Sequence, residues 1–172
     1  MTSLMFIFIG MFTAIITELI CGSIGIIVPL AALMLFYFSM TTGWEAGLAA
    51  GAVCGISIDM LYGRNIYFTP FIFVAVAAIS IIWLRRRESK SYLMSTFPGM
   101  AIAALCVVPT IILSSLSMGL NWSILFMNMA NLFFAIIFSA FFLPMLIIIM
   151  DYFSNKLGLP LFREANERIT KA

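Results

Sequence analysis

Histidine is absent from this chain, and charged residues are scarce. Without histidine, the chain cannot contain the two-histidine zinc motif of metalloproteases or a serine–histidine or cysteine–histidine catalytic pair. No glycine-rich loop precedes a lysine, as phosphate binding would require. Only one carboxylate, Asp59, lies inside an apolar stretch away from its ends, so a paired-aspartate intramembrane protease is not expected either. These absences argue against an enzyme, and the sequence predicts no cofactor and no bound metal.

Charge is also too sparse for a soluble protein. Charged residues make up 9% of the 172 positions and apolar residues 64%, whereas in soluble domains about a quarter of the residues are charged. The chain is therefore predicted to be an integral membrane protein. Long apolar runs satisfy their backbone polar groups in lipid only as helices, so the predicted fold class is all-α. The net charge of +2 says little about partners, because membrane orientation explains the basic residues, and no nucleic-acid partner is expected.

Cysteine is rare as well. Cys21, Cys54 and Cys106 are single, widely spaced residues with apolar neighbours. This pattern has neither the spacing of metal ligands nor the even count of a disulfide framework. We interpret the three cysteines as packing residues.

The apolar sequence divides at its polar, glycine and proline positions into six segments, each near the ~20 residues that cross a bilayer core. The first segment lacks the basic start and the cleavage site of a signal peptide, so we expect it to be retained as a helix. Short loops place consecutive helices antiparallel. The sequence thus predicts a polytopic membrane protein with one domain, residues 1–150, a compact bundle of six transmembrane helices. The predicted spans are residues 3–20, 24–40, 45–62, 66–84, 95–117 and 122–150.

The basic residues fall on one side of these spans. Eight of the nine follow either the fourth span, between Arg85 and Lys90, or the sixth span, from Lys156 onward. Basic residues favour the cytoplasmic side, which places both clusters and both chain termini inside, an N-in/C-in topology. Only Arg64 lies on the outer side.

Residues 151–172 form the predicted cytoplasmic tail. Gly158 suits the end of the sixth helix, and Pro160 can begin a new, short amphipathic helix. Two interpretations stay open for that helix: it lies on the inner membrane surface, or it docks a cytoplasmic partner.

Glycine recurs at every fourth position of the third span. A step of four residues turns a helix by about 400°, so these positions stay near one face and form a groove without side chains. Small-residue grooves allow helices to pack closely in lipid. We predict that this groove binds a partner through Gly47, Gly51, Gly55, Asp59 and Gly63.

Polar residues from several spans are predicted to meet in the outer half of the bundle. A carboxylate such as Asp59 costs at least ~2.5 kcal/mol to bury in hydrocarbon, so it is a functional candidate. Polar side chains at such depth face the bundle interior or a water-filled cavity. The other members of this predicted outer polar cluster are Glu18, Arg64, Asn65, Asn121, Asn128 and Asn131.

Five of these residues also have a purely structural interpretation. Asp59 could pair with Arg64 at the membrane interface, and Glu18 could extend toward water. Asn128 and Asn131 could simply join neighbouring helices. The sequence leaves these alternatives open.

The third and fourth spans resemble a known family. The run GWEAGLAAGAVCGISIDMLYGRNIYFTPFIF combines the glycine repeat, one aspartate near the helix end, a glycine four residues later and a further apolar helix. In these features, in overall size and in the basic loop that follows, the chain resembles the MreD rod shape-determining membrane proteins. The positions that match the family's pattern are Gly51, Gly55, Asp59 and Gly63.

The resemblance implies a non-enzymatic scaffold in the bacterial inner membrane that acts in cell elongation. Such a protein would regulate cell shape by binding the bitopic protein MreC and linking it to peptidoglycan synthesis. The wider complex implied contains the actin-like MreB, RodA and the transpeptidase partner of RodA, surrounded by membrane lipids. The predicted docking surface consists of spans one, three and six.

Two other hypotheses stay open. The chain also resembles the substrate-binding S component of an energy-coupling-factor transporter in its length, six spans and outward polar site, although its first span lacks the AxxxA spacing usual there. That hypothesis predicts a small vitamin-like ligand bound from outside. The third hypothesis is a lipid-handling protein, in which Asp59 would bind a headgroup.

Overall fold

The computed structural model describes residues 2–64, 67–85, 92–118 and 122–162. Every regular element in these residues is helical, which confirms the predicted all-α class for this part of the chain. A short 3-10 helix, η1 (Tyr92–Ser95), precedes α5. The described ranges contain six α-helices: α1 (Thr2–Ser23), α2 (Leu30–Thr42), α3 (Trp44–Leu61), α4 (Thr69–Arg85), α5 (Thr96–Met118) and α6 (Trp122–Lys156).

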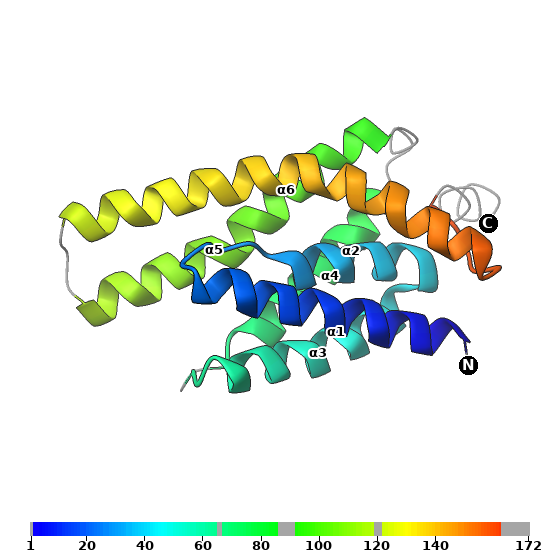
Figure 1. Ribbon diagram of the computed structural model, residues 1–172, viewed down its shortest axis with the longest axis horizontal. Helices are drawn as coiled ribbons and strands as arrows, with labels where there is room; N and C mark the ends of the chain where they lie inside the picture. Colours follow the sequence, from blue (N-terminus) through cyan, green and yellow to red (C-terminus); the bar gives the residue numbers. More distant parts are fainter. Residues whose placement is uncertain (1, 65–66, 86–91, 119–121, 163–172) are drawn as a thin grey trace.

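Consecutive α-helices run in alternating directions along the long axis of the molecule (Figure 1). The start of α1 and the end of α6 lie at the same end of the bundle. At the opposite end, α5 and α6 extend as a hairpin beyond the other helices. Short connections between sequential helices produce this antiparallel order.

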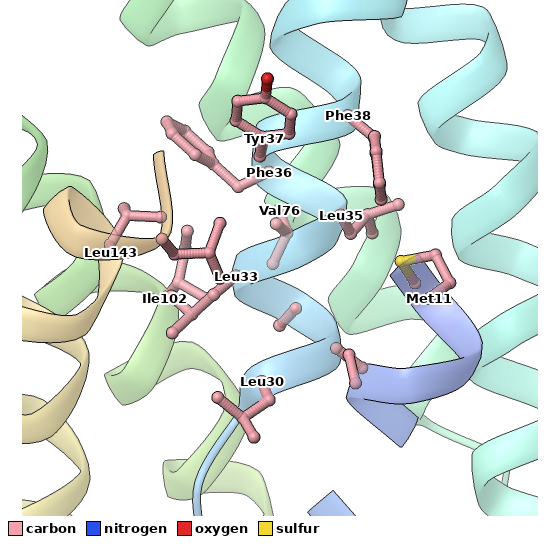
Figure 2. Packing of buried hydrophobic residues seen from close by; sticks show 14 of the residues in the cluster. Met11, Leu30, Leu33, Leu35, Phe36, Tyr37, Phe38, Val76, Ile102 and Leu143 are labelled. Carbon is pink, nitrogen blue, oxygen red and sulfur yellow. The ribbon is translucent and has the colours of Figure 1, made fainter. Parts of the chain in front are cut away.

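Helix α2 is the centre of the packing (Figure 2). Eleven of its 13 residues are buried, so it is apolar and enclosed nearly all round. Helices α1, α3 and α4 pack against it directly, and α5 and α6 contribute further side chains. Core residues that surround α2 in Figure 2 include Met11 of α1, Val76 of α4, Ile102 of α5 and Leu143 of α6.

The predicted span 24–40 begins too early. Helix α2 starts at Leu30, directly after Pro29. Gly25 has a φ of +86°, a left-handed conformation that ends α1 and that glycine adopts without strain. Proline lacks an N–H group and has a fixed φ, so it suits the beginning of a helix. A non-helical link therefore joins α1 to α2, and α2 is left with a length of about 20 Å.

Three of the described helices, α1, α5 and α6, are long and apolar enough to cross a membrane by length and composition. Helices α2 and α4 are shorter apolar helices. Helix α6 is the longest element, with 35 residues or about 52 Å of helix. It continues through Pro144 and ends at Lys156, beyond the predicted limit of the sixth span.

A buried polar network fastens the end of α6 to α2. The Tyr37 hydroxyl donates to Oδ1 of Asp151 at 2.9 Å and lies 3.0 Å from Oγ of Ser154. The N–H of Phe162 donates to the same Asp151 oxygen at 3.0 Å. The chain turns back after Gly158, whose φ is +65°, as predicted for the end of this helix. The beginning of the predicted tail is thus the last part of α6, in which Asp151 and Ser154 are buried, and most of the predicted amphipathic helix falls outside the described residues.

One close helix contact comes from a glycine outside the repeat. A Cβ atom on Gly99 of α5 would lie 2.6 Å from the backbone oxygen of Ser139 on α6. Real Cβ atoms do not approach so closely, so only glycine permits this contact between the two helices. The close approach of α5 to α6 at this point therefore requires a glycine that no sequence pattern distinguished.

Candidate functional site

Helix α3 ends in a tight turn built around Gly63. The φ of Gly63 is +61°. Its N–H donates to the carbonyl of Met60 at 3.1 Å, and the N–H of Arg64 donates to the carbonyl of Asp59 at 3.0 Å. These two bonds form the Schellman motif, which satisfies the last carbonyls of a helix. The turn brings Arg64 back alongside the final turn of α3, where its side chain meets Asp59.

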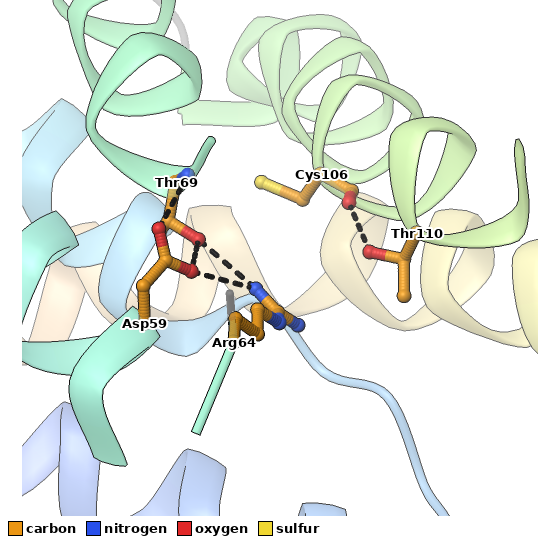
Figure 3. A network of polar contacts seen from close by, with 5 residues as sticks. All are labelled: Asp59, Arg64, Thr69, Cys106 and Thr110. Atoms are coloured by element: carbon orange, nitrogen blue, oxygen red, sulfur yellow. Dashed lines mark hydrogen bonds and ion pairs between the residues drawn. The ribbon is translucent and has the colours of Figure 1, made fainter. Parts of the chain in front are cut away.

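Asp59 is completely buried and accepts three hydrogen bonds (Figure 3). Its Oδ2 accepts the N–H of Thr69 at 2.9 Å. Its Oδ1 accepts the hydroxyl of Thr69 and, at 3.0 Å, Nη1 of Arg64. Of the interpretations left open for Asp59, the structure therefore contains the ion pair with Arg64. A lipid headgroup at Asp59 would have to displace these donors.

Arg64, the cationic member of this ion pair, has further contacts. Its Nη1 also donates to the hydroxyl of Thr69 at 3.0 Å. The guanidinium carbon lies 4.9 Å from the ring centre of Tyr62 and 4.6 Å from that of Phe68, within cation–π range. The side chain is 28% exposed, so it is partly accessible from outside the bundle. Arg64 is thus held by one carboxylate, one hydroxyl and two rings.

The glycine face of α3 is turned toward helices of the same chain. A Cβ atom on Gly55 would lie 2.7 Å from the backbone N and Cα of Pro70, at the start of α4. A Cβ atom on Gly51 would lie 3.0 Å from a methyl group of Leu35 on α2. Gly47 is similarly close to Ser39 of α2. The close packing expected of the groove is present, but the groove lies inside the bundle. Direct contact of a partner with these glycines stays a prediction, and it would require the helices to separate.

A cavity of about 240 Å³ lies next to the Asp59–Arg64 pair. It is enclosed by the end of α1, the α1–α2 link, the end of α3, the start of α4 and the middle of α5. On the α1 side, the Glu18 carboxylate accepts the N–H of Ala31 at 3.0 Å. Most of the wall is apolar, and its polar side chains are Glu18, Tyr62, Arg64, Thr69 and Thr110.

The predicted outer polar cluster forms only in part. Glu18, on α1, and Arg64, which follows α3, line the same cavity. Asn128 and Asn131 lie on α6, which packs mainly against α5, and they do not line the cavity. Helix α6 therefore does not bring its asparagines to the site, contrary to the expected convergence of spans one, three and six. The remaining two members, Asn65 and Asn121, lie outside the described residues.

Thr69 is the functional residue that sequence reasoning missed. It donates both its N–H and its hydroxyl to Asp59, so it supplies two of the three hydrogen bonds that this carboxylate accepts. A threonine directly before a proline at the beginning of an apolar run is typical of a helix start. That pattern, Thr69 followed by Pro70, identifies a cap but not the distant carboxylate that it serves.

No protein-family model matches the chain, and no curated protein or solved structure is significantly similar to it. The fold and the site therefore define only a class: an all-helical protein with membrane-length helices and a partly polar cavity beside a buried ion pair.

The conformation of Gly63 leads to a first prediction. Gly63→Ala places a Cβ atom in the left-handed region and is expected to cost about 1–2 kcal/mol of stability. Gly63→Asn is the matched control, because asparagine enters this region more readily. The apparent melting temperature of the detergent-solubilised protein should fall more for alanine than for asparagine. Equal melting temperatures for the two variants would show that this turn does not limit stability.

Proposed function

We propose that this chain is a non-enzymatic, multi-pass scaffold of the MreD type in the bacterial inner membrane, with MreC as its direct partner. The observation that carries the proposal is the unit formed by Gly55, Asp59 and Gly63. These residues carry the family resemblance, and each has a distinct task in joining α3 to α4. The motif therefore corresponds to a closely packed and hydrogen-bonded helix pair, which suits a scaffold.

The arrangement of the helices supports the proposed six-span, N-in/C-in topology. The α-helices alternate in direction, and the beginning of α1 and the end of α6 share one end of the bundle (Figure 1). In this topology α2 crosses the membrane inside the protein, shielded from lipid by its neighbours. The cavity and Arg64 then face the outside.

The partner surface that we propose is the outward side of α3. Since the glycines face inward, the opposite side of the helix is available, and its exposed apolar residues are Val53, Ile56 and Met60. The glycines would then act indirectly by fixing the position of this surface. MreB, RodA and its transpeptidase partner would join through the wider complex.

Two experiments test the scaffold. Depletion of the protein in its rod-shaped host should make the cells round. In a copurification assay, Val53→Trp should reduce recovery of MreC roughly fivefold or more, equivalent to about 1 kcal/mol. Phe133→Trp, an equally exposed position on α6, is the control and should leave recovery unchanged. Normal cell shape after depletion, or full MreC recovery with Val53→Trp, would contradict the scaffold or its surface, respectively.

The cavity favours a second candidate function, that of a transporter S component. Concave sites with mostly apolar walls and a few polar groups are typical of small-ligand binding. Native mass spectrometry of the purified protein separates the two functions. A stoichiometric vitamin-like ligand together with a nutrient requirement in depleted cells would support transport, whereas an MreC complex without such a ligand would support the scaffold.

A further inference from the structure

The cavity is large enough for a small organic molecule. Its volume is about 240 Å³, whereas an apolar cavity of about 150 Å³ can hold benzene. Its wall combines aliphatic side chains with two charged groups, Glu18 on α1 and Arg64 after α3. The kind of molecule that this cavity can bind therefore depends on which hydrogen-bonding atoms of Glu18 and Arg64 have no partner within the protein.

Glu18 offers a carboxylate oxygen that no group of the described residues satisfies. One carboxylate oxygen, Oε2, accepts the N–H of Ala31. Among the described residues, no cationic group lies within 4.0 Å of the Glu18 carboxylate, and its other oxygen accepts no hydrogen bond. A half-buried carboxylate gains most from a charged hydrogen-bond donor, and an ammonium group is the compact form of such a donor.

Arg64 offers unused hydrogen-bond donors to the same cavity. Its Nη1 is occupied by Asp59 and Thr69. The guanidinium group has five N–H donors in all, and within the described part of the chain its other two nitrogens have no hydrogen-bond partner. Figure 3 shows these nitrogens turned away from Asp59 and Thr69. Guanidinium donors fit the oxygens of a carboxylate or phosphate.

We propose that this cavity binds a small zwitterion, with its ammonium group on Glu18 and its anionic group on Arg64. The inference goes beyond the scaffold function and does not depend on it. A simple anion would leave Glu18 without a cationic partner, and a simple amine would leave two guanidinium nitrogens of Arg64, whose charge Asp59 already pairs, without acceptors. Two sources supply this chemistry: a free solute such as phosphoethanolamine, or the same group as the headgroup of phosphatidylethanolamine.

The test uses the full-length protein and two matched acidic variants. Glu18→Gln removes the charge but keeps an oxygen for the N–H of Ala31, so folding should be preserved, which circular dichroism checks. Glu45→Gln makes the same change at an exposed position away from the cavity. The first readout is the apparent melting temperature in detergent with phosphoethanolamine, ethanolamine or inorganic phosphate. The second is native mass spectrometry after reconstitution in an equal mixture of phosphatidylethanolamine and phosphatidylglycerol.

Stabilisation by phosphoethanolamine above both of its fragments would support a soluble zwitterion. Selective retention of phosphatidylethanolamine without that response would support the lipid headgroup. In either case Glu18→Gln should weaken binding at least about tenfold, and Glu45→Gln should match the wild type. Equal retention of the two lipids with no response to phosphoethanolamine, equal binding of ethanolamine alone, or unchanged binding by Glu18→Gln would overturn the proposal. Cell shape after depletion does not bear on it.

Discussion

Replacing Gly55 with alanine is expected to lower the apparent melting temperature of the protein by about 5–10 °C. The new Cβ atom would lie 2.7 Å from backbone atoms of Pro70, which cannot rotate away as a side chain can. Overpacking of this kind typically costs 1–3 kcal/mol or more, and in a chain of this size about 2–4 °C is lost per kcal/mol. Helix α3 must therefore move away from α4. The measurement is thermal unfolding of the detergent-solubilised protein, followed by intrinsic fluorescence.

Gly51→Ala is the matched control on the same face of the same helix. There the Cβ atom would lie 3.0 Å from a methyl group of Leu35 and 3.3 Å from Cβ of Phe73, so it would meet side chains, which can shift more readily than backbone atoms. Alanine also favours a helix by up to about 1 kcal/mol relative to glycine. We therefore expect little change, or a small gain, at Gly51. Equal losses at Gly51 and Gly55 would contradict the backbone contact between α3 and Pro70.

Removal of Arg64 is expected to be the second strongly destabilising change. Arg64→Ala leaves the carboxylate of Asp59 buried with its two Thr69 bonds but without a counter-charge. Breaking a buried pair in this way costs about 3–5 kcal/mol. Because Arg64 is 28% exposed, we expect the lower end, about 3 kcal/mol, or about 6–12 °C in apparent melting temperature.

A double-mutant cycle separates the charge effect from the lost ring contacts. In the Asp59→Asn background the side chain is neutral, so Arg64→Ala should cost far less than in the wild type. The contacts of Arg64 with Tyr62 and Phe68 are lost in both backgrounds and cancel. We expect a coupling energy of about 1–3 kcal/mol. Strictly additive losses would show that Asp59 and Arg64 do not stabilise each other.

The sequence predicted the local parts of this site well, for physical reasons. The glycine repeat and Gly63 reflect contacts and backbone angles within a few residues, which a pattern can reveal. The sequence analysis also offered the pairing of Asp59 with Arg64 as one interpretation. The two residues are close in the sequence, because Asp59 lies in the last turn of α3 and Arg64 in the tight turn that follows. The use of Gly63 as a helix terminator follows from the same local rules.

The contacts between residues that are distant in the sequence could not be predicted. Nothing in the sequence indicates that α2, rather than the glycine-rich α3, is the central helix, because all segments are similarly apolar. The N–H of Ala31 reaches Glu18 only because α1 ends at Ser23, before Gly25, and the chain crosses to α2. The glycine groove was correctly recognised as a packing surface, but its neighbours were not, since the same pattern suits a helix of the chain or of another protein.

The shortness of α2 has an electrical consequence in the proposed topology. A helix of about 20 Å covers only two thirds of a hydrocarbon layer ~30 Å thick. The rest of the depth is occupied by the α1–α2 link and the cavity, and irregular backbone at that level is stable beside protein or water. Water in this recess would thin the insulating layer, so most of the membrane voltage would fall across α2. Glu18 and Arg64 would then sit near the external potential, and their ligand would bind without crossing the field.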